Sequence, residues 1–133
     1  MSVMYSSHGQ VFEDFSDGDF KVDPIWTTSN DDLWQVNAQQ LQSNSPEAAS
    51  YWISTPSNAA NNGIWEFNIR LEFATSGVNY VDIFLLSDSE NLSLTTDGYF
   101  VRVGDTQDEI GLYKLEDGIT TPLIDEAEGV VNS

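Results

Sequence analysis

The feature that most constrains the fold is residues 64–73, where apolar and polar side chains alternate. The large apolar residues of this stretch are Trp65, Phe67, Ile69, Leu71 and Phe73. A β-strand turns successive side chains to opposite faces, whereas a helix would scatter these five groups around its circumference. The pattern predicts a long strand whose apolar face covers a hydrophobic core. Its polar face is expected to meet water or a ligand.

Other strand signals recur at short spacing, and turn residues separate them. Residues 80–87 are almost continuously apolar, which is typical of a strand covered on both faces. Glu116-Asp117-Gly118 indicates a hairpin. Further strands are expected at residues 11–15, 33–36, 39–42, 51–54, 98–104, 110–115 and 119–124, with a short edge strand within 20–28. No segment of helical length shows a 3.6-residue period, so we predict an all-β fold, an antiparallel two-sheet β-sandwich of the jelly-roll type.

The charge of the chain limits its partners. Among 133 residues, 22 are acidic and 4 are basic, which gives a net charge of −18. Phosphate backbones would be repelled, so we expect no nucleic-acid partner. No apolar run approaches the roughly 18 residues of a membrane span, so no membrane insertion is expected. Bound Ca²⁺, a saline habitat or a solvated acidic surface would each account for the acidity.

The N-terminus reads differently from the remainder of the chain. Ser7 and Gly9 are small residues at the −3 and −1 positions of a cleavage site before Gln10. Residues 1–9 are therefore predicted to be the remnant of a secretory signal or a disordered N-terminus. Residues 10–133 are predicted to form a single β-sandwich domain of a secreted or cell-surface protein. We assign no role to His8, the only histidine.

An ordered series of short motifs resembles a known type of domain. The motifs are VFEDFSDGDF (11–20), PIW (24–26), YWIST (51–55), WEF (65–67), NYVDIFLLSD (79–88) and GYFVRVG (98–104). Together they resemble the concanavalin A-like (LamG-like) lectin/glucanase-type domain at the N-terminus of secreted Bacteroidetes proteins. The resemblance covers roughly residues 10–125.

The resemblance implies a two-sheet jelly roll and a role in carbohydrate binding or cell-surface adhesion. Family members usually continue through several more strands after a segment like residues 119–133, where this chain stops. The resemblance therefore predicts either a domain truncated at its C-terminus or one that closes its sheet in some other way, and a truncated sandwich would expose strand edges. Such edges invite pairing with a second chain, so we expect a homodimer formed through them.

Two acidic turns are candidate metal sites. Asp14, Asp17 and Asp19 form one oxygen-rich cluster, and residues 30–32 form another. Ca²⁺ takes six to eight oxygen ligands, often from such turns. Aspartates in turns also commonly accept hydrogen bonds from their own backbone. The first cluster is the favoured Ca²⁺ site.

A carbohydrate site would combine an aromatic platform with planar polar groups. The candidates are Trp52, Asn68, Arg70, Asp82 and Arg102. The alternative for both arginines is ion pairing with Glu66, Glu72 or Asp82. Trp65 and Phe67 are expected in the core, whereas Trp26 and Trp34, like Trp52, could either plug the end of a sandwich or stack on a sugar.

Catalysis is not expected. Glucanases of this type use paired carboxylates, but the strand around Asp82 offers only one. Glu66 and Glu72 would lie roughly 20 Å apart along a strand, too far for a glycosidase pair. The sequence thus favours a non-catalytic carbohydrate-binding or adhesion module. A purely structural interaction domain and an unusual glycoside hydrolase are the alternatives.

Overall fold

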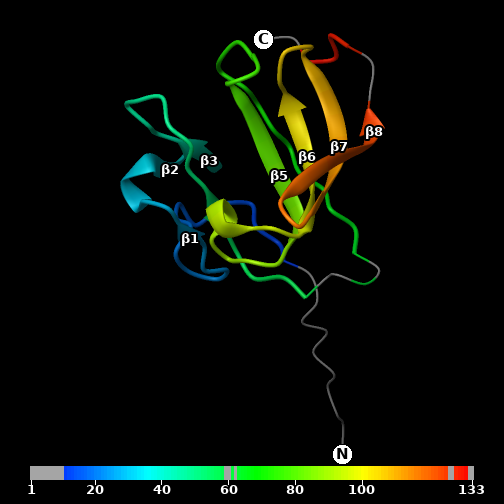
Figure 1. Ribbon diagram of the computed structural model, residues 1–133. Helices are drawn as coiled ribbons and strands as arrows, with labels where there is room; N and C mark the ends of the chain where they lie inside the picture. The colour runs from blue at the N-terminus through cyan, green and yellow to red at the C-terminus, as the bar shows by residue number, and fades with distance from the viewer. Residues whose placement is uncertain (1–10, 59–60, 62, 126–127, 132–133) are drawn as a thin grey trace, which may run out of the picture. The chain divides into compact units, whose positions relative to one another are not determined.

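The computed structural model describes residues 11–58, 61, 63–125 and 128–131 (Figure 1). Over these ranges the chain is all-β, with three antiparallel sheets and two single-turn 3₁₀ helices. None of the described helices is long and apolar enough to cross a membrane. The predicted signal remnant, residues 1–9, lies outside the described residues. The expected all-β class is confirmed.

Contacts group the chain into two compact units. The first comprises Met1–Ile64 and Glu90–Ser93, and the second comprises Trp65–Ser89 and Leu94–Ser133. That residues 10–133 form one domain stays a prediction.

The first unit contains two small sheets. Strand β1 (Thr27–Thr28) pairs with β4 (Ile53–Ser54), and β2 (Trp34–Asn37) pairs with β3 (Gln40–Ser43). The 3₁₀ helix η1 (Asp31–Leu33) precedes β2. The predicted hairpin at 33–36 and 39–42 is therefore confirmed, with each strand shifted by one residue. The strand predicted at 11–15 is wrong, because those residues form no ladder.

The second unit is built on a four-stranded antiparallel sheet in the order β5-β6-β7-β8. Its strands are β5 (Tyr80–Ser87), β6 (Gly98–Gly104), β7 (Glu109–Glu116) and β8 (Ile119–Asp125). The other 3₁₀ helix, η2 (Leu92–Leu94), occurs between β5 and β6. Short turns join β6 to β7 and β7 to β8, so neighbouring strands in the sheet are neighbours in sequence. The four strands match the prediction, and two of them match residue for residue.

Strand β6 lies at the centre of the second unit's core. Phe100 and Val103 are buried, and their odd spacing places them on opposite faces of β6. The β7–β8 hairpin turns at Asp117 and Gly118, which both have positive φ, as a two-residue type I′ turn requires. Strand β8 is exposed along its whole length and forms an edge of the sheet. The sheet therefore has a covered centre and an open edge.

The long strand predicted at residues 64–73 is wrong. These residues join no ladder, and Figure 1 draws them as a coil. Trp65 and Phe67, expected in the core, are 39% and 45% exposed. Just after the segment, the Thr75 hydroxyl donates a hydrogen bond to Asp108 in the β6–β7 turn. This contact ties the chain to that turn, and no backbone ladder joins residues 64–73 to the edge of β5.

Candidate functional site

The candidate site is one face of the β5–β6–β7 sheet, centred on Arg102. We call it the Arg102 face and define it as Tyr80, Asp82, Phe100, Arg102, Asp105 and Tyr113. The register places Asp82 opposite Arg102, and Arg102 opposite Gly111. Side chains at alternate positions of a strand share a face, so the residues from β5, β6 and β7 converge on the same side.

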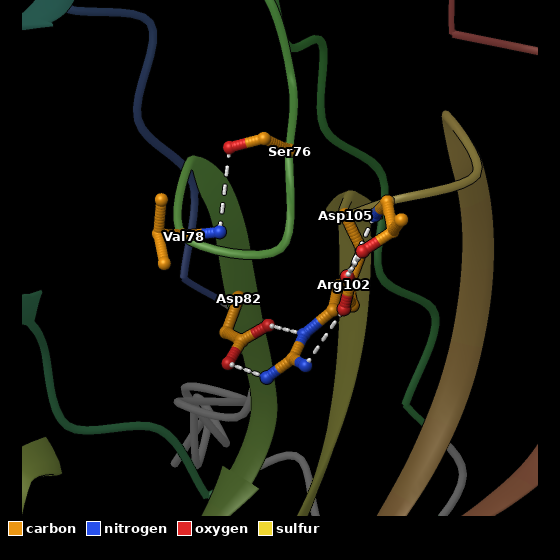
Figure 2. A network of polar contacts seen from close by, with 6 residues as sticks. Ser76, Val78, Asp82, Arg102 and Asp105 are labelled. Carbon is orange, nitrogen blue, oxygen red and sulfur yellow. Dashed lines mark hydrogen bonds and ion pairs between the residues drawn. The ribbon is translucent and has the colours of Figure 1, made fainter.

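Arg102 is held by two carboxylates (Figure 2). Its Nε donates to Asp82 Oδ1 at 2.7 Å, and its Nη2 donates to Asp82 Oδ2 at 2.8 Å. Its Nη1 donates to Asp105 Oδ2 at 3.2 Å. Guanidinium has five N–H donors, so each terminal nitrogen keeps one N–H with no partner among the described residues. The bidentate geometry fixes the plane of the guanidinium group.

Charge and burial both act on these groups. The side chains of Arg102 and Asp82 are only 20% and 24% exposed, so their ion pair is partly shielded from water. Hydrogen bonding to Asp82 raises the pKa of Arg102 above its ordinary value. The backbone N–H of Thr106 lowers the pKa of Asp105, and hydrogen bonds from the Thr106 hydroxyl and from Arg102 lower it further. Arg102 and Asp105 are therefore both charged at neutral pH.

Aromatic rings surround the guanidinium group. The Arg102 Cζ atom lies 3.9 Å from the centroid of Tyr80 and 5.6 Å from those of Phe100 and Tyr113. Phe100 and Tyr113 stack with centroids 5.3 Å apart. A Cβ atom at Gly111 would approach the Tyr113 ring to 2.7 Å, so the glycine makes the room in which this ring lies. The site is thus a planar charged pair among flat rings.

The predicted ligand residues differ in their contacts. The structure brings Asp82 and Arg102 together, in the ion pair that is the alternative to ligand binding. Arg70 pairs with Glu72 on its own segment, at 2.7 Å between Nε and Oε1. Asn68 is exposed and contacts no other described residue through a polar group.

Trp52 belongs to the first unit, where its carbonyl accepts from the Ser29 backbone N–H at 3.0 Å. The other two tryptophans near loops also pack within that unit. Trp26 lies 6.2 Å from Phe15, and Trp34 makes an edge-to-face contact with Tyr51 at 5.4 Å. Their indole nitrogens are buried. Trp26 and Trp34 therefore pack against aromatic side chains within the first unit.

The predicted Ca²⁺ ligands form successive turns. Asp14 accepts from the Ser16 backbone at 3.0 Å, Asp17 from Asp19 at 3.2 Å, and Asp19 from Lys21 at 2.7 Å. Each carboxylate thus satisfies its own turn. No group of three or more His, Cys, Asp or Glu suited to a metal ion occurs in the part of the chain that the structure describes. Calcium binding stays a prediction.

Sequence reasoning missed the aromatic part of the Arg102 face and Asp105. The sequence pattern places Tyr80, Phe100 and Tyr113 in strands but gives them no role at a site. A usable signal is present, because Asp117-Gly118 fixes the β7–β8 register and a four-residue acidic turn joins β6 to β7. No known protein family, no curated protein and no solved structure matches this chain.

Proposed function

We propose that this protein is a non-catalytic binding module, secreted or held at the cell surface, that recognises a glycan at the Arg102 face. In this proposal the β5–β8 sheet is one layer of a concanavalin A-like jelly roll. One observation carries the idea: the Tyr80 ring, 38% exposed, lies 3.9 Å from a guanidinium group that two carboxylates hold in place. Sugar sites use such pairings of aromatic faces with planar polar groups.

The free N–H groups of Arg102 and the lone pairs of Asp82 would pair with sugar hydroxyls, while Tyr80 would cover an apolar face of the ring. Binding is favoured over catalysis because a general acid needs a raised pKa, and the pKa of Asp105 is lowered. The Asp82 and Asp105 carboxylates already accept hydrogen bonds from Arg102. In this proposal both carboxylates hold the guanidinium group in place for the ligand.

A glycan array that includes β-glucans, probed with and without Ca²⁺, tests the proposal. The best binder is then titrated calorimetrically against Tyr80→Ala and Tyr99→Ala. Tyr99 is a matched control, because it is 37% exposed and lies on the opposite face of the sheet. We expect Tyr80→Ala to weaken binding about tenfold and Tyr99→Ala to leave it unchanged.

Equal effects of the two substitutions would place the ligand elsewhere, and turnover of a β-glucan would replace binding by catalysis. Binding that needs Ca²⁺ and is lost in Asp17→Asn would assign the metal to the 14–19 turn.

A structural interaction domain is the second candidate. The observation that favours it is the exposure of the apolar side chains of residues 65–73, of which Trp65, Phe67, Ile69 and Phe73 are each at least 39% exposed.

A further inference from the structure

Residues 65–73 combine a strand sequence with an unpaired backbone. The segment makes no backbone hydrogen bond to another described residue. Its apolar side chains are exposed, apart from the half-buried Leu71. Beside it lies an open hollow of about 420 Å³, lined by Leu71, Glu72, Phe73 and Ala74. An exposed apolar segment whose backbone N–H and C=O groups have no partner among the described residues is a template for another strand.

We propose that residues 65–73 pair antiparallel with the same residues of a second copy of this chain, about a two-fold axis through Asn68. The proposal goes beyond glycan binding and does not depend on it, since the Arg102 face lies on β5, β6, β7 and the turn after β6. The proposed pairing gives residues 65–73 the strand conformation that their alternating pattern favours.

Charge complementarity selects the second copy as the occupant. With the axis at Asn68, Glu66 of each chain lies opposite Arg70 of the other, so two ion pairs form on the polar face. On the apolar face Trp65 lies opposite Leu71, and Phe67 lies opposite Ile69. Only changes of register by an even number of residues keep the apolar side chains of both chains on the same face of the strand pair.

The neighbouring registers place charges less favourably or align fewer residues. An axis at Ile69 would set Glu66 opposite Glu72, and an axis at Arg70 would set the two arginines opposite each other. Like charges directly opposite destabilise a strand pair. An axis at Leu71 would also set Arg70 opposite a glutamate, Glu72, but it aligns only residues 69–73 of the segment. The Asn68 axis is therefore the register that aligns most of the segment with favourable charges.

The net charge of −18 on each copy opposes association at long range. Salt screens this repulsion over a Debye length of about 8 Å at physiological ionic strength. Directly opposed residues of paired strands lie closer than that, about 5 Å apart, so the Glu66–Arg70 contacts are screened less than the overall repulsion. We therefore expect the dimer to form more readily at moderate salt than at low salt.

The test is sedimentation of the full chain across a concentration series. Wild type is expected to dimerise. Arg70→Glu and Glu66→Arg are each expected to weaken association more than about tenfold, because like charges then oppose each other twice. Both side chains are exposed, so neither substitution disturbs the fold. Lys21→Glu is the control, since it changes the net charge as Arg70→Glu does but lies in the first unit.

Two combinations of these substitutions test the proposed register. A mixture of the Arg70→Glu and Glu66→Arg chains should form a heterodimer, and the Glu66→Arg/Arg70→Glu double variant should regain self-association. A wild type that stays monomeric at the highest concentration overturns the proposal. So does association of either single variant at wild-type strength, or recovery with Glu72→Arg in place of Glu66→Arg.

Discussion

Strand β5 and residues 65–73 are separated by one short turn and are similarly rich in large apolar side chains. Every residue of β5 except Leu85 is in register with β6, whereas residues 65–73 join no ladder. Their charged groups differ in the same way. Asp82 on β5 pairs with the partly buried Arg102, while Arg70 and Glu72 are 76% and 73% exposed.

The difference shows what pairing requires beyond a suitable pattern. Strand β6 follows β5 through a loop of ten residues, β7 follows β6 through four, and β8 follows β7 through two. Short closures carry a small entropy cost, so these ladders form from local contacts. Residues 65–73 have no such backbone partner in the part of the chain that the structure describes. An apolar pattern defines the faces of a strand, but a neighbouring backbone must complete it.

The largest expected effect compares the two arginines. Arg102→Leu leaves Asp82 and Asp105 half-buried without a cation, and we expect a loss of about 2–3 kcal/mol in the free energy of unfolding. Arg70→Leu removes an exposed pair and should cost less than about 0.5 kcal/mol. Both variants lose one positive charge, so each controls for net charge. Urea unfolding followed by circular dichroism measures both. Equal losses would mean that residues 65–73 are as tightly packed as the sheet.

A smaller effect tests the local closure of the ladder. Gly118 has a φ of +75°, and no atom lies within 4 Å of the place that a Cβ would take, so Gly118→Ala adds backbone strain without a clash. We expect a loss of about 1 kcal/mol in the free energy of unfolding, together with faster amide exchange in β8. Unchanged stability and exchange would show that the turn does not hold this hairpin.

The smallest effect concerns pH. Burial raises the pKa of Glu109, and Asp125, Asp105 and Glu128 raise it further. A carboxyl group whose pKa is raised in the folded state contributes to stability when the pH lies below its ordinary pKa of 4.5. This contribution is lost as the pH rises through the folded-state pKa. Glu109→Gln should therefore raise Tm by about 2 °C at neutral pH and by almost nothing near pH 3. A gain of equal size at both pH values would rule out this electrostatic cause.

Local features of the sequence predicted much of the sheet. The bounds of β5 and β6 follow from their apolar runs, and Asp117-Gly118 locates the β7–β8 turn. The Asp82–Arg102 ion pair is the alternative that the sequence offers for Arg102, because cations are scarce in so acidic a chain. In these cases the paired strands are consecutive along the chain and are joined by loops of ten residues or fewer.

Other features depend on strand register and side-chain packing, which the apolar pattern alone does not specify. The position of Tyr113 near Arg102 requires the β6–β7 register and the absence of a side chain at Gly111. Residues 65–73 join no ladder although their side chains alternate, and the nearby Thr75 hydroxyl bonds to Asp108, which is 33 residues away in sequence. Alternation alone therefore predicts a strand that the structure does not contain.

Residue-resolved amide hydrogen exchange at high dilution tests the central claim most directly. The amides of β6 and β7 should be protected to the level of global unfolding, while those of residues 65–73 should exchange almost as fast as in an unfolded chain. Protection of residues 65–73 that equals that of β6, in a sample shown to be monomeric, would contradict the account.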